Sequence, residues 1–345
     1  MKQFDLLNNK LLSLLDDKYS VDIFSGKIGL CIYFYYLSRW ENNKKYESIA
    51  DKLLDEATDT LPNYLDITVE NGLAGIAIGI SHLVKANFVA GDINVILEEV
   101  DNRIFKILAF LKYEESKIPK QTLILLLFYF YLRYTEQSST DDKYIFQELI
   151  IKTVELFQHN LPSFYFHDHF SFSAKNYQTP LFLFVISKIY DLNIYNKRID
   201  KILREFYSPI MSTIPVLHSN RLYLIFGLLN IKTRFPEYEN EIVSRIRLLM
   251  ERIDIVHIMN VELKNQDIYL DSGVSFVYFL LFYIHEKFSD YRIHFHPQLF
   301  FDRIKNSEAW DAMLNREYYL YKHRGLFNGY PGAYLTMLHI KNHFL

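Results

Sequence analysis

Two polar residues that precede apolar segments, His218 and Asp271, are the first candidates for chemistry in this sequence. An imidazole and a carboxylate are donors for a metal site of the harder, nitrogen- and oxygen-liganded kind, and both residues are candidate catalytic groups. Two ligands are too few to hold a metal, so a third would have to come from His323 or from one of His167 and His169. The simpler interpretation is that His218 is a loop histidine hydrogen-bonded to the backbone and that Asp271 is the N-cap of the following helix.

Two His-x-His pairs, at 167–169 and 294–296, and two arginines are further candidates. On a strand, this spacing points two imidazoles to one side, which suits a metal, although such pairs are commonly surface or aromatic-packed histidines. Arg221 and Arg324 lie near loops before apolar segments and could bind a peptide carboxylate. The alternative is that each arginine is an ordinary ion-pair partner.

Aromatic residues are frequent, with 27 tyrosines and 28 phenylalanines, and some occur in runs such as Tyr33–Tyr36 and Phe128–Tyr131. Such rings could line a peptide-binding cavity. Consecutive residues of a helix point to different sides, so only some members of each run can face a cavity. Core packing is therefore the default interpretation of these runs.

Composition and missing motifs narrow the functional classes. With a net charge of −3, the protein has no overall positive charge to attract nucleic acid or anionic lipid. The single cysteine, Cys31, excludes an internal disulfide or a multi-cysteine metal site. The longest apolar runs, Leu123–Leu132 and Phe276–Ile284, are about half the length of a bilayer span, and the first residues do not resemble a signal peptide. We expect no nucleic-acid partner, no membrane span and a cytoplasmic location. The sequence contains no Walker loop, nucleotide fingerprint, serine hydrolase elbow or zinc-protease helix.

The candidates lie between helical segments of two alternating kinds. Segments that are apolar nearly all round are Leu30–Trp40, Leu73–Ala86, Leu123–Tyr134, Thr179–Tyr190, Leu222–Ile231, Val274–His285 and Ala333–Phe344. Amphipathic segments are 2–16, 45–60, Ile93–Tyr113, Lys143–His159, Ile199–Tyr207, Tyr238–Ile253 and 297–317. The last apolar segment has no successor, so segment 2–16 can be its partner and close a ring. The pattern predicts an all-α fold, a single domain over 1–345 and a barrel of inner helices surrounded by outer helices. Only in Tyr165–Phe172 do aromatic and polar residues alternate in the way that is typical of a short β-hairpin.

A Gly-x-x-Gly step begins three of the apolar segments, as Gly26-Lys-Ile-Gly29, Gly72-Leu-Ala-Gly75 and Gly329-Tyr-Pro-Gly332. Glycine at such a place allows a close backbone approach and a positive φ. Three copies in phase with the helical alternation indicate one repeated supersecondary unit.

With these motifs, this helix order and this length, the sequence resembles the lanthionine synthetase C (LanC-like) family, the cyclases that complete thioether rings in ribosomally made peptides. The resemblance spans essentially the whole chain. It implies an α/α toroid of about seven inner and seven outer helices. It also implies a zinc ion that holds a substrate cysteine as thiolate for addition to a dehydrated serine or threonine, and a histidine that protonates the resulting enolate.

The residues that would hold this zinc are missing. His218 stands nearest to the zinc cysteine of the fifth repeat, and Asp271-Ser272-Gly273 aligns with the Cys-His-Gly step of the sixth. The fourth repeat, at Lys175–Pro180, lacks the His-Gly pair of the acid, and Cys31 lies in the first repeat. Without thiolates the site loses the soft, anionic donors that hold zinc, so we expect neither zinc nor zinc-dependent cyclisation.

Three functional hypotheses follow. The first is a non-catalytic, LanC-like protein of lanthipeptide-type maturation that binds a precursor peptide or a peptide-modifying dehydratase. The second is an α/α-barrel carbohydrate-active enzyme with paired carboxylates, for which Asp168, Asp271 and Asp311 are the candidates. The third is a thioether-forming cyclase with a non-standard metal at His218 and Asp271.

Overall fold

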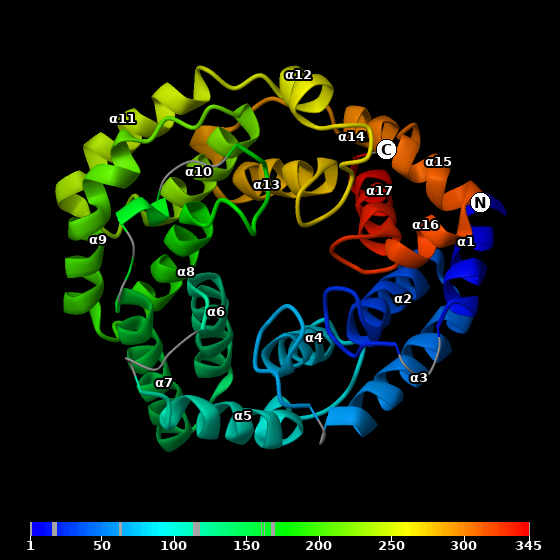
Figure 1. The fold of residues 1–345 in the computed structure, drawn as a ribbon, viewed down its shortest axis with the longest axis horizontal. Coiled ribbons are helices and arrows are strands. Elements are labelled where there is room, and N and C mark those ends of the chain that lie inside the picture. Colours follow the sequence, from blue (N-terminus) through cyan, green and yellow to red (C-terminus); the bar gives the residue numbers. More distant parts are fainter. Residues whose placement is uncertain are drawn as a thin grey trace. The chain divides into compact units, whose positions relative to one another are not determined.

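The computed structural model describes residues 2–15, 19–61, 64–112, 118–159, 161, 163–166 and 170–344. Over these ranges every regular element is a helix and no strand occurs, so the predicted all-α class is confirmed (Figure 1). The chain divides into two compact units, the first formed by 1–66, 70–88 and 255–345 and the second by 67–69 and 89–254. The single domain over 1–345 stays a prediction, and each unit is described by itself.

The first unit contains both ends of the sequence. Its helices are α1 (Lys2–Ser13), α2 (Lys27–Glu41), α3 (Lys44–Thr60), α4 (Leu73–Lys85), α12 (Ile255–His257), η4 (Ile258–Glu262), α13 (Val274–Lys287), η5 (Ser289–Tyr291), α14 (Pro297–Lys305), α15 (Glu308–Asn315), α16 (Glu317–Lys322) and α17 (Tyr330–Phe344). The apolar helices α4, α2, α17 and α13 contact one another in that order. The amphipathic helices pack on them, α3 on α2 and α14 on both α13 and α17.

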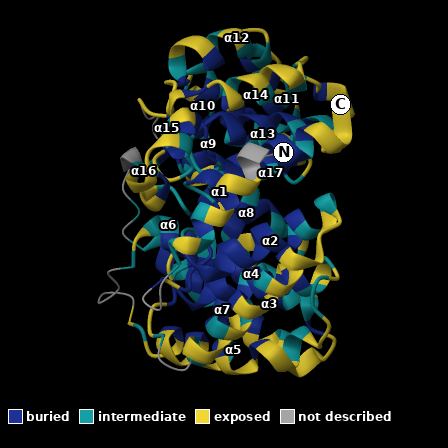
Figure 2. Cartoon of the chain, turned by 90° about the vertical axis from the view of Figure 1, so that its right-hand side faces the viewer, coloured by how far each residue is buried: buried dark blue, intermediate teal, exposed yellow. Residues whose placement is uncertain are grey.

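The second unit repeats this arrangement. Its helices are α5 (Ile93–Ala109), α6 (Lys120–Glu136), α7 (Thr140–Gln158), η2 (Ser163–Phe166), α8 (Thr179–Asp191), α9 (Asn196–Ser212), α10 (His218–Ile231), η3 (Pro236–Tyr238) and α11 (Glu239–Met250). The apolar helices α6, α8 and α10 form a row, and α7, α9 and α11 pack on them in turn. Each predicted apolar segment is thus a helix, and Figure 2 shows the apolar helices as mostly buried and the amphipathic ones as partly exposed.

The difference between the two kinds of helix follows from their side chains. In α3 the buried residues are Tyr46, Ala50, Leu53 and Ala57, whose spacing of three or four places them on one face. The Asn43 side chain caps this helix by accepting a hydrogen bond from the Lys45 N–H at 3.1 Å. The apolar helices bury residues on nearly every side, so other helices or loops must pack against all of their faces.

One main-chain hydrogen bond recurs before four apolar helices, α2, α4, α13 and α17. In each case the first residue of the helix, which follows a glycine, donates its N–H to the carbonyl seven positions earlier. The pairs are Lys27 to Ser20 at 2.8 Å, Leu73 to Asp66 at 2.8 Å, Val274 to Asp267 at 2.9 Å and Tyr330 to His323 at 2.8 Å. The repeated unit predicted from three glycine steps is confirmed, and the structure adds a fourth copy that ends at Gly273.

Close approach, and not a positive φ, explains the glycine that caps each repeat. A Cβ on Gly26 would lie 2.6 Å from the Ser20 carbonyl oxygen, and one on Gly329 would lie 2.2 Å from that of His323. The φ of Gly26 is −102°, which other residues also adopt. The expected close approach is therefore confirmed, while the expected positive φ is wrong because the loop closes through an ordinary extended residue.

The opening helix joins the last apolar helix, as the ring-closing prediction requires. The Asn8 side chain of α1 accepts hydrogen bonds from the Tyr33 hydroxyl of α2 at 2.5 Å and from the Tyr330 hydroxyl of α17 at 3.1 Å. Leu7 and Leu11 of α1 are fully buried. The two ends of the sequence therefore share one core within the first unit.

The hairpin expected at Tyr165–Phe172 is wrong where the structure describes it. Residues Ser163–Phe166 form the short helix η2, 170–172 are not a strand, and 167–169 lie outside the described residues. The Phe166 ring is fully buried against Phe182 and Phe206, so aromatic packing explains the alternation.

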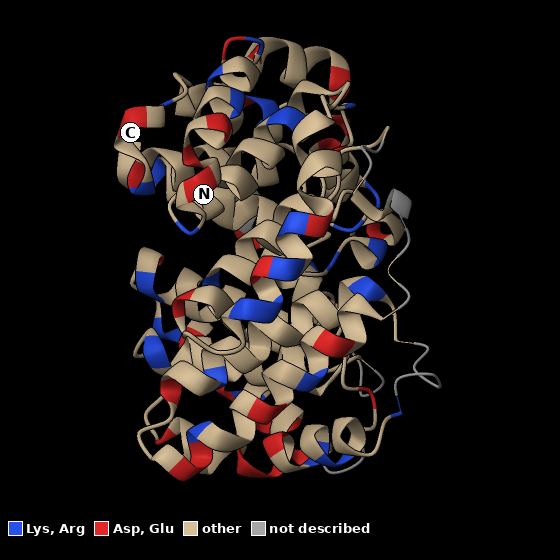
Figure 3. Cartoon of the chain, turned by 90° about the vertical axis from the view of Figure 1, so that its left-hand side faces the viewer, with Lys and Arg blue, Asp and Glu red and all other residues tan. Residues whose placement is uncertain are grey.

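The surface carries both signs of charge, scattered over the helices (Figure 3). Among the described helices, none combines the length and the apolar character that crossing a bilayer would require.

Candidate binding site

The aromatic runs divide into buried and half-buried rings. In α6, Tyr129 and Phe130 are buried, whereas Phe128 and Tyr131 on either side of them are half-buried. In the run Tyr33–Tyr36 only the last ring is half-buried. Core packing is thus the correct interpretation for most of these rings, and a few remain available to a ligand.

The half-buried rings of the second unit contact one another across three helices. Phe184 of α8 lies 5.9 Å from Phe128 of α6 and 5.2 Å from Phe226 of α10, between ring centroids. Tyr131 lies 6.3 Å from Phe128 on the same helix. We call Phe128, Tyr131, Phe184 and Phe226 the aromatic stripe. Partly exposed rings in a row offer an apolar surface with polar edges, which suits aromatic and aliphatic side chains of a peptide.

The Lys188 ammonium group and the Tyr131 hydroxyl add polar groups to the aromatic stripe. The Lys188 Nζ lies 5.3 Å from the Phe184 ring centroid, within cation–π range. Burial raises the pKa of Tyr131 above its usual value, and the nearby Asp191 carboxylate acts in the same direction. The Tyr131 hydroxyl therefore stays protonated and can donate a hydrogen bond.

In the first unit, two repeat loops bring Asp271 and His323 into one region. The N–H groups of Leu270 and Asp271 both donate to the carbonyl of Phe327, at 2.9 and 3.1 Å. Burial lowers the pKa of His323 below its usual value, and the carboxylate of Asp271 opposes this shift. His323, named as a possible third ligand beside Asp271, thus belongs to the loop whose Phe327 carbonyl accepts the hydrogen bond from the Asp271 N–H.

The His323 ring is held in one orientation. It stacks on Tyr269 at 5.0 Å with an interplanar angle of 4°, and on Tyr319 at 4.4 Å. Its Nδ1 lies 3.2 Å from the carbonyl oxygen of Asn328. Because a carbonyl only accepts, this contact assigns the proton to Nδ1 and leaves the lone pair on Nε2 for a proton, a metal or a ligand donor.

The N-cap interpretation of Asp271 is wrong. The helix α13 begins at Val274, its N-cap is Gly273, and no side chain caps it. The Asp271 Oδ1 instead accepts a hydrogen bond from the Ser272 hydroxyl at 2.9 Å. The loop before α13 closes through the main-chain hydrogen bond from the Val274 N–H to the Asp267 carbonyl, so the Asp271 carboxylate takes no part in the start of this helix.

Arg324 lies between two tyrosines of the same unit. Its guanidinium carbon is 4.1 Å from the Tyr19 ring centroid and 4.0 Å from that of Tyr321, and its Nη1 donates to the Leu14 carbonyl at 3.2 Å. Stacking and a backbone contact hold this arginine, so its described contacts are not those of an ordinary ion pair.

His218 and Arg221 lie in the second unit and contact backbone. His218 is the first residue of α10, and its Nδ1 accepts a hydrogen bond from the Asp254 N–H at 3.0 Å, which confirms the backbone interpretation. Arg221 donates to the carbonyls of Pro215 at 2.7 Å and of Val216 and Arg252 at 3.2 Å. Its described partners are thus carbonyls and not the expected carboxylate. Since Asp271 belongs to the other unit, a metal held by His218 and Asp271 stays a prediction.

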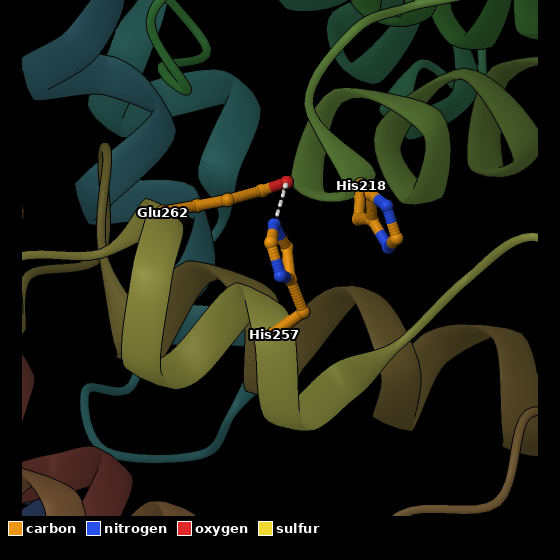
Figure 4. Close-up of side chains that lie close together, drawn as sticks. All are labelled: His218, His257 and Glu262. Atoms are coloured by element: carbon orange, nitrogen blue, oxygen red, sulfur yellow. Dashed lines mark ion pairs between the residues drawn. The ribbon is translucent and has the colours of Figure 1, made fainter.

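The first unit also contains a histidine–glutamate contact that the sequence pattern does not predict. His257 Nε2 lies 3.8 Å from Glu262 Oε1, and the Glu262 side chain is only 4% exposed (Figure 4). Five residues along an α-helix are rotated by about 140°, so the spacing predicts no contact. Residues Ile258–Glu262 form a π-helical turn, which changes that rotation and is common at functional sites.

The remaining predicted residues contribute less. His167, Asp168 and His169 lie outside the described residues. His294 and His296 are exposed on either side of Phe295, which packs on Tyr278 and Phe300, so the surface interpretation of this pair is correct.

Asp311, a candidate carboxylate for a carbohydrate-active enzyme, is exposed on α15. Its Oδ1 accepts a hydrogen bond from the Asn315 side chain at 2.8 Å. An exposed carboxylate that contacts its own helix does not favour a paired acid and base.

Comparison of the sequence with protein-family models gives no match, and comparison with curated proteins gives none either.

Proposed function

We propose that this protein is a LanC-like α/α toroid of about seven inner and seven outer helices that binds, without catalysis, a precursor peptide or a peptide-modifying dehydratase during lanthipeptide-type maturation in the cytoplasm. The observation that carries the binding role is the aromatic stripe, where rings from α6, α8 and α10 lie in contact yet remain partly exposed. Apolar rings that are neither buried nor isolated are typical of surfaces that bind apolar side chains.

Two features support the toroid. Rows of apolar helices, each with an amphipathic partner, occur in both units. The repeated loop before α2, α4, α13 and α17 and the contact of α1 with α17 are what a ring of repeated helix pairs requires. An experimental density map of the whole chain, by crystallography or electron microscopy, tests this arrangement; an open row of helices would overturn it.

The absence of zinc is part of the proposal and rests on donor chemistry. The only thiol, Cys31, is buried in α2, where it donates to the Ala50 carbonyl at 3.4 Å, and burial raises its pKa far above the usual value. It is therefore a neutral core residue and not a thiolate ligand. Elemental analysis of protein purified without chelators tests this point, and one zinc per chain would overturn it.

The binding role is tested by titrating the purified protein with candidate precursor peptides and with a partner dehydratase. Replacing Phe184→Ser or Phe226→Ser is expected to weaken peptide binding about tenfold or more, because each ring loses its apolar contact. The matched control is Phe110→Ser in the same unit, since Phe110 is 85% exposed and lies apart from the stripe. Equal affinities for all three variants and the unchanged protein would overturn a role of the stripe.

One observation favours a second candidate function, a thioether-forming cyclase with a non-standard site. Asp271 and His323 lie on joined loops, and the Nε2 of His323 carries a lone pair. Incubation with a dehydrated, cysteine-bearing peptide, followed by mass spectrometry of thiol-blocked products, tests this function. Ring formation that is lost in His323→Gln would replace the non-catalytic proposal.

A further inference from the structure

A second surface lies on the second unit, between helices α5 and α7. A hollow of about 440 Å³ opens there, and its floor includes Arg133 of α6, which is 1% exposed. The lining residues that matter for binding fall into two groups, carboxylates and exposed apolar side chains. None of them belongs to the aromatic stripe.

The hollow carries net negative charge. Its lining contains the carboxylates of Glu98, Asp101 and Asp142, and among the described lining residues Arg133 is the one cation. That cation is already neutralised, because its guanidinium lies 2.8 Å from Asp101 Oδ2 and 2.5 Å from Glu136 Oε2. Within the part of the chain that the structure describes, neither Glu98 nor Asp142 forms an ion pair, so their charges are available to a cationic ligand.

Apolar side chains stand at the rim of the same hollow. Val95 is 71% exposed, Phe105 37% and Ile145 43%, although all three line the hollow. Together these three side chains offer apolar area to a partner.

The shape of the groove favours a chain segment over a small molecule. Along α5 the residues Val95, Glu98, Asn102 and Phe105 follow one another at spacings of three or four, so they form one stripe about 15 Å long. On α7 the residues Asp142 and Ile145 face the same hollow. The α5 stripe therefore has an apolar residue at each end with polar residues between them, and α7 adds one acidic and one apolar residue.

We propose that the groove between α5 and α7 binds a basic amphipathic segment of a partner protein or peptide, with lysine or arginine side chains on Glu98 and Asp142 and aliphatic side chains on Val95, Phe105 and Ile145. Charge complementarity selects the basic residues, and the exposed rim selects the apolar ones. This inference goes beyond the proposed function, because it uses other residues and requires no LanC-like role.

The test measures binding of two synthetic probes by fluorescence anisotropy. One is a labelled peptide of about twelve residues, three helical turns, built from Leu-Lys-Lys-Leu repeats, and the other has glutamate in place of every lysine. We expect the basic probe to bind and the acidic probe to bind at least tenfold more weakly, with affinity for the basic probe falling as salt rises. Equal binding of the two probes would overturn the proposal.

Variants locate the site. The double replacement Glu98→Gln and Asp142→Asn is expected to lower the affinity for the basic probe about tenfold. The double replacement Val95→Ser and Ile145→Ser is expected to lower it by about the same factor. The matched control is Asp55→Asn with Asp59→Asn, which removes two exposed carboxylates from α3 of the other unit. An equal loss in the control would show non-specific attraction and overturn the proposal. The variant Phe110→Ser, which alters neither the aromatic stripe nor the hollow, should leave the basic probe's affinity unchanged.

Two further measurements use the unchanged protein. A basic probe that carries a photoreactive benzophenone should cross-link to α5 and α7, as mapped by mass spectrometry, and cross-links only elsewhere would overturn the proposal. Displacement of the probe by an equal concentration of 1,4-diaminobutane would also overturn it, since the hollow would then take a small amine and not a chain segment.

Discussion

At the scale of single residues, Gly29 and Gly332 show how closely the repeated loops pack on their helices. A Cβ on Gly29 would lie 2.3 Å from the carbonyl oxygen of Ile23, and one on Gly332 would lie 2.0 Å from that of Leu326. Both carbonyls belong to the backbone of a loop, which cannot rotate away as a side chain can. These glycines are therefore required by space.

We predict that Gly29→Ala lowers the free energy of unfolding by about 1–3 kcal/mol, because the added methyl group forces the loop away from α2. Urea unfolding followed by circular dichroism measures the change. The control is Lys305→Ala at an exposed position of α14, which should stay within about 0.5 kcal/mol of the unchanged protein. An unchanged midpoint for Gly29→Ala would contradict the close approach.

A second residue-scale feature is the environment of His339 on α17. Its Nδ1 lies 2.8 Å from the Tyr278 hydroxyl, and its ring stacks on His343 at 4.0 Å. Burial, with a smaller effect of the neighbouring His343, lowers the pKa of His339 to about 4. The folded protein therefore holds this imidazole neutral.

This shift predicts that acid weakens the fold. An unfolded histidine has a pKa of about 6.5, so the unfolded state binds more protons than the folded state between pH 6.5 and pH 4. The contribution of His339 is fully present above about pH 6.5 and is lost as the pH falls toward 4. We expect a loss of about 1–2 kcal/mol, since the ring is partly exposed to screening solvent.

Urea unfolding at pH 7.0 and pH 4.5 measures this loss. In His339→Gln the difference between the two pH values should shrink by that amount, whereas His294→Gln, at an exposed position, should leave it unchanged. The same pH dependence in all three proteins would show that His339 is not its source.

At the scale of elements, helix starts differ in how much they depend on a side chain. The Ser307 side chain, 2% exposed, accepts a hydrogen bond from the Trp310 N–H at 3.0 Å and donates one to the Ile304 carbonyl at 2.8 Å. Ser139 caps α7 in the same way, but in solvent and with a longer distance of 3.4 Å to the Asp142 N–H.

We predict that Ser307→Ala costs about 1–2 kcal/mol and Ser139→Ala about 0.5 kcal/mol or less, because only the first leaves buried polar groups without a partner. Thermal and urea unfolding of the two variants, compared side by side, check the order. A larger loss for Ser139→Ala would contradict the burial argument.

At the scale of the whole molecule, the two ends of the sequence meet in the buried cluster of Asn8, Tyr33 and Tyr330. These residues come from α1, α2 and α17, so the cluster joins segments that are more than 300 positions apart. The Asn8 Oδ1 accepts hydrogen bonds from both hydroxyl groups. Because the Asn8 side chain is buried, water cannot replace this acceptor.

We predict that Asn8→Ala lowers the free energy of unfolding by about 2–3 kcal/mol, since two buried hydroxyls lose their acceptor. The matched control is Asn315→Ala, whose side chain is exposed and bonds only to Asp311 among described residues. If both variants unfold at the same urea concentration, the junction between the ends of the chain does not stabilise the protein as described.

Much of the fold was predictable because its signals are local. The apolar segment Leu73–Ala86 became α4 (Leu73–Lys85), and the amphipathic segment 45–60 became α3 (Lys44–Thr60). Helix periodicity and glycine steps depend on residues a few positions apart, which the sequence displays directly. The Gly-x-x-Gly pattern does not indicate the fourth repeat loop, because Phe276 and not a glycine stands three residues after Gly273.

The candidate sites were less predictable, because they depend on residues far apart. By itself the sequence determined the helical class, the order of apolar and amphipathic helices and the absence of a second thiol, since composition and periodicity fix these. Only the tertiary structure decided that the loops of Asp271 and His323 are joined, that Phe184 but not Tyr129 stays accessible, and that Glu98 and Ile145 line one hollow. Packing between helices sets which side of each helix remains open, and that packing is not written in any short stretch of the chain.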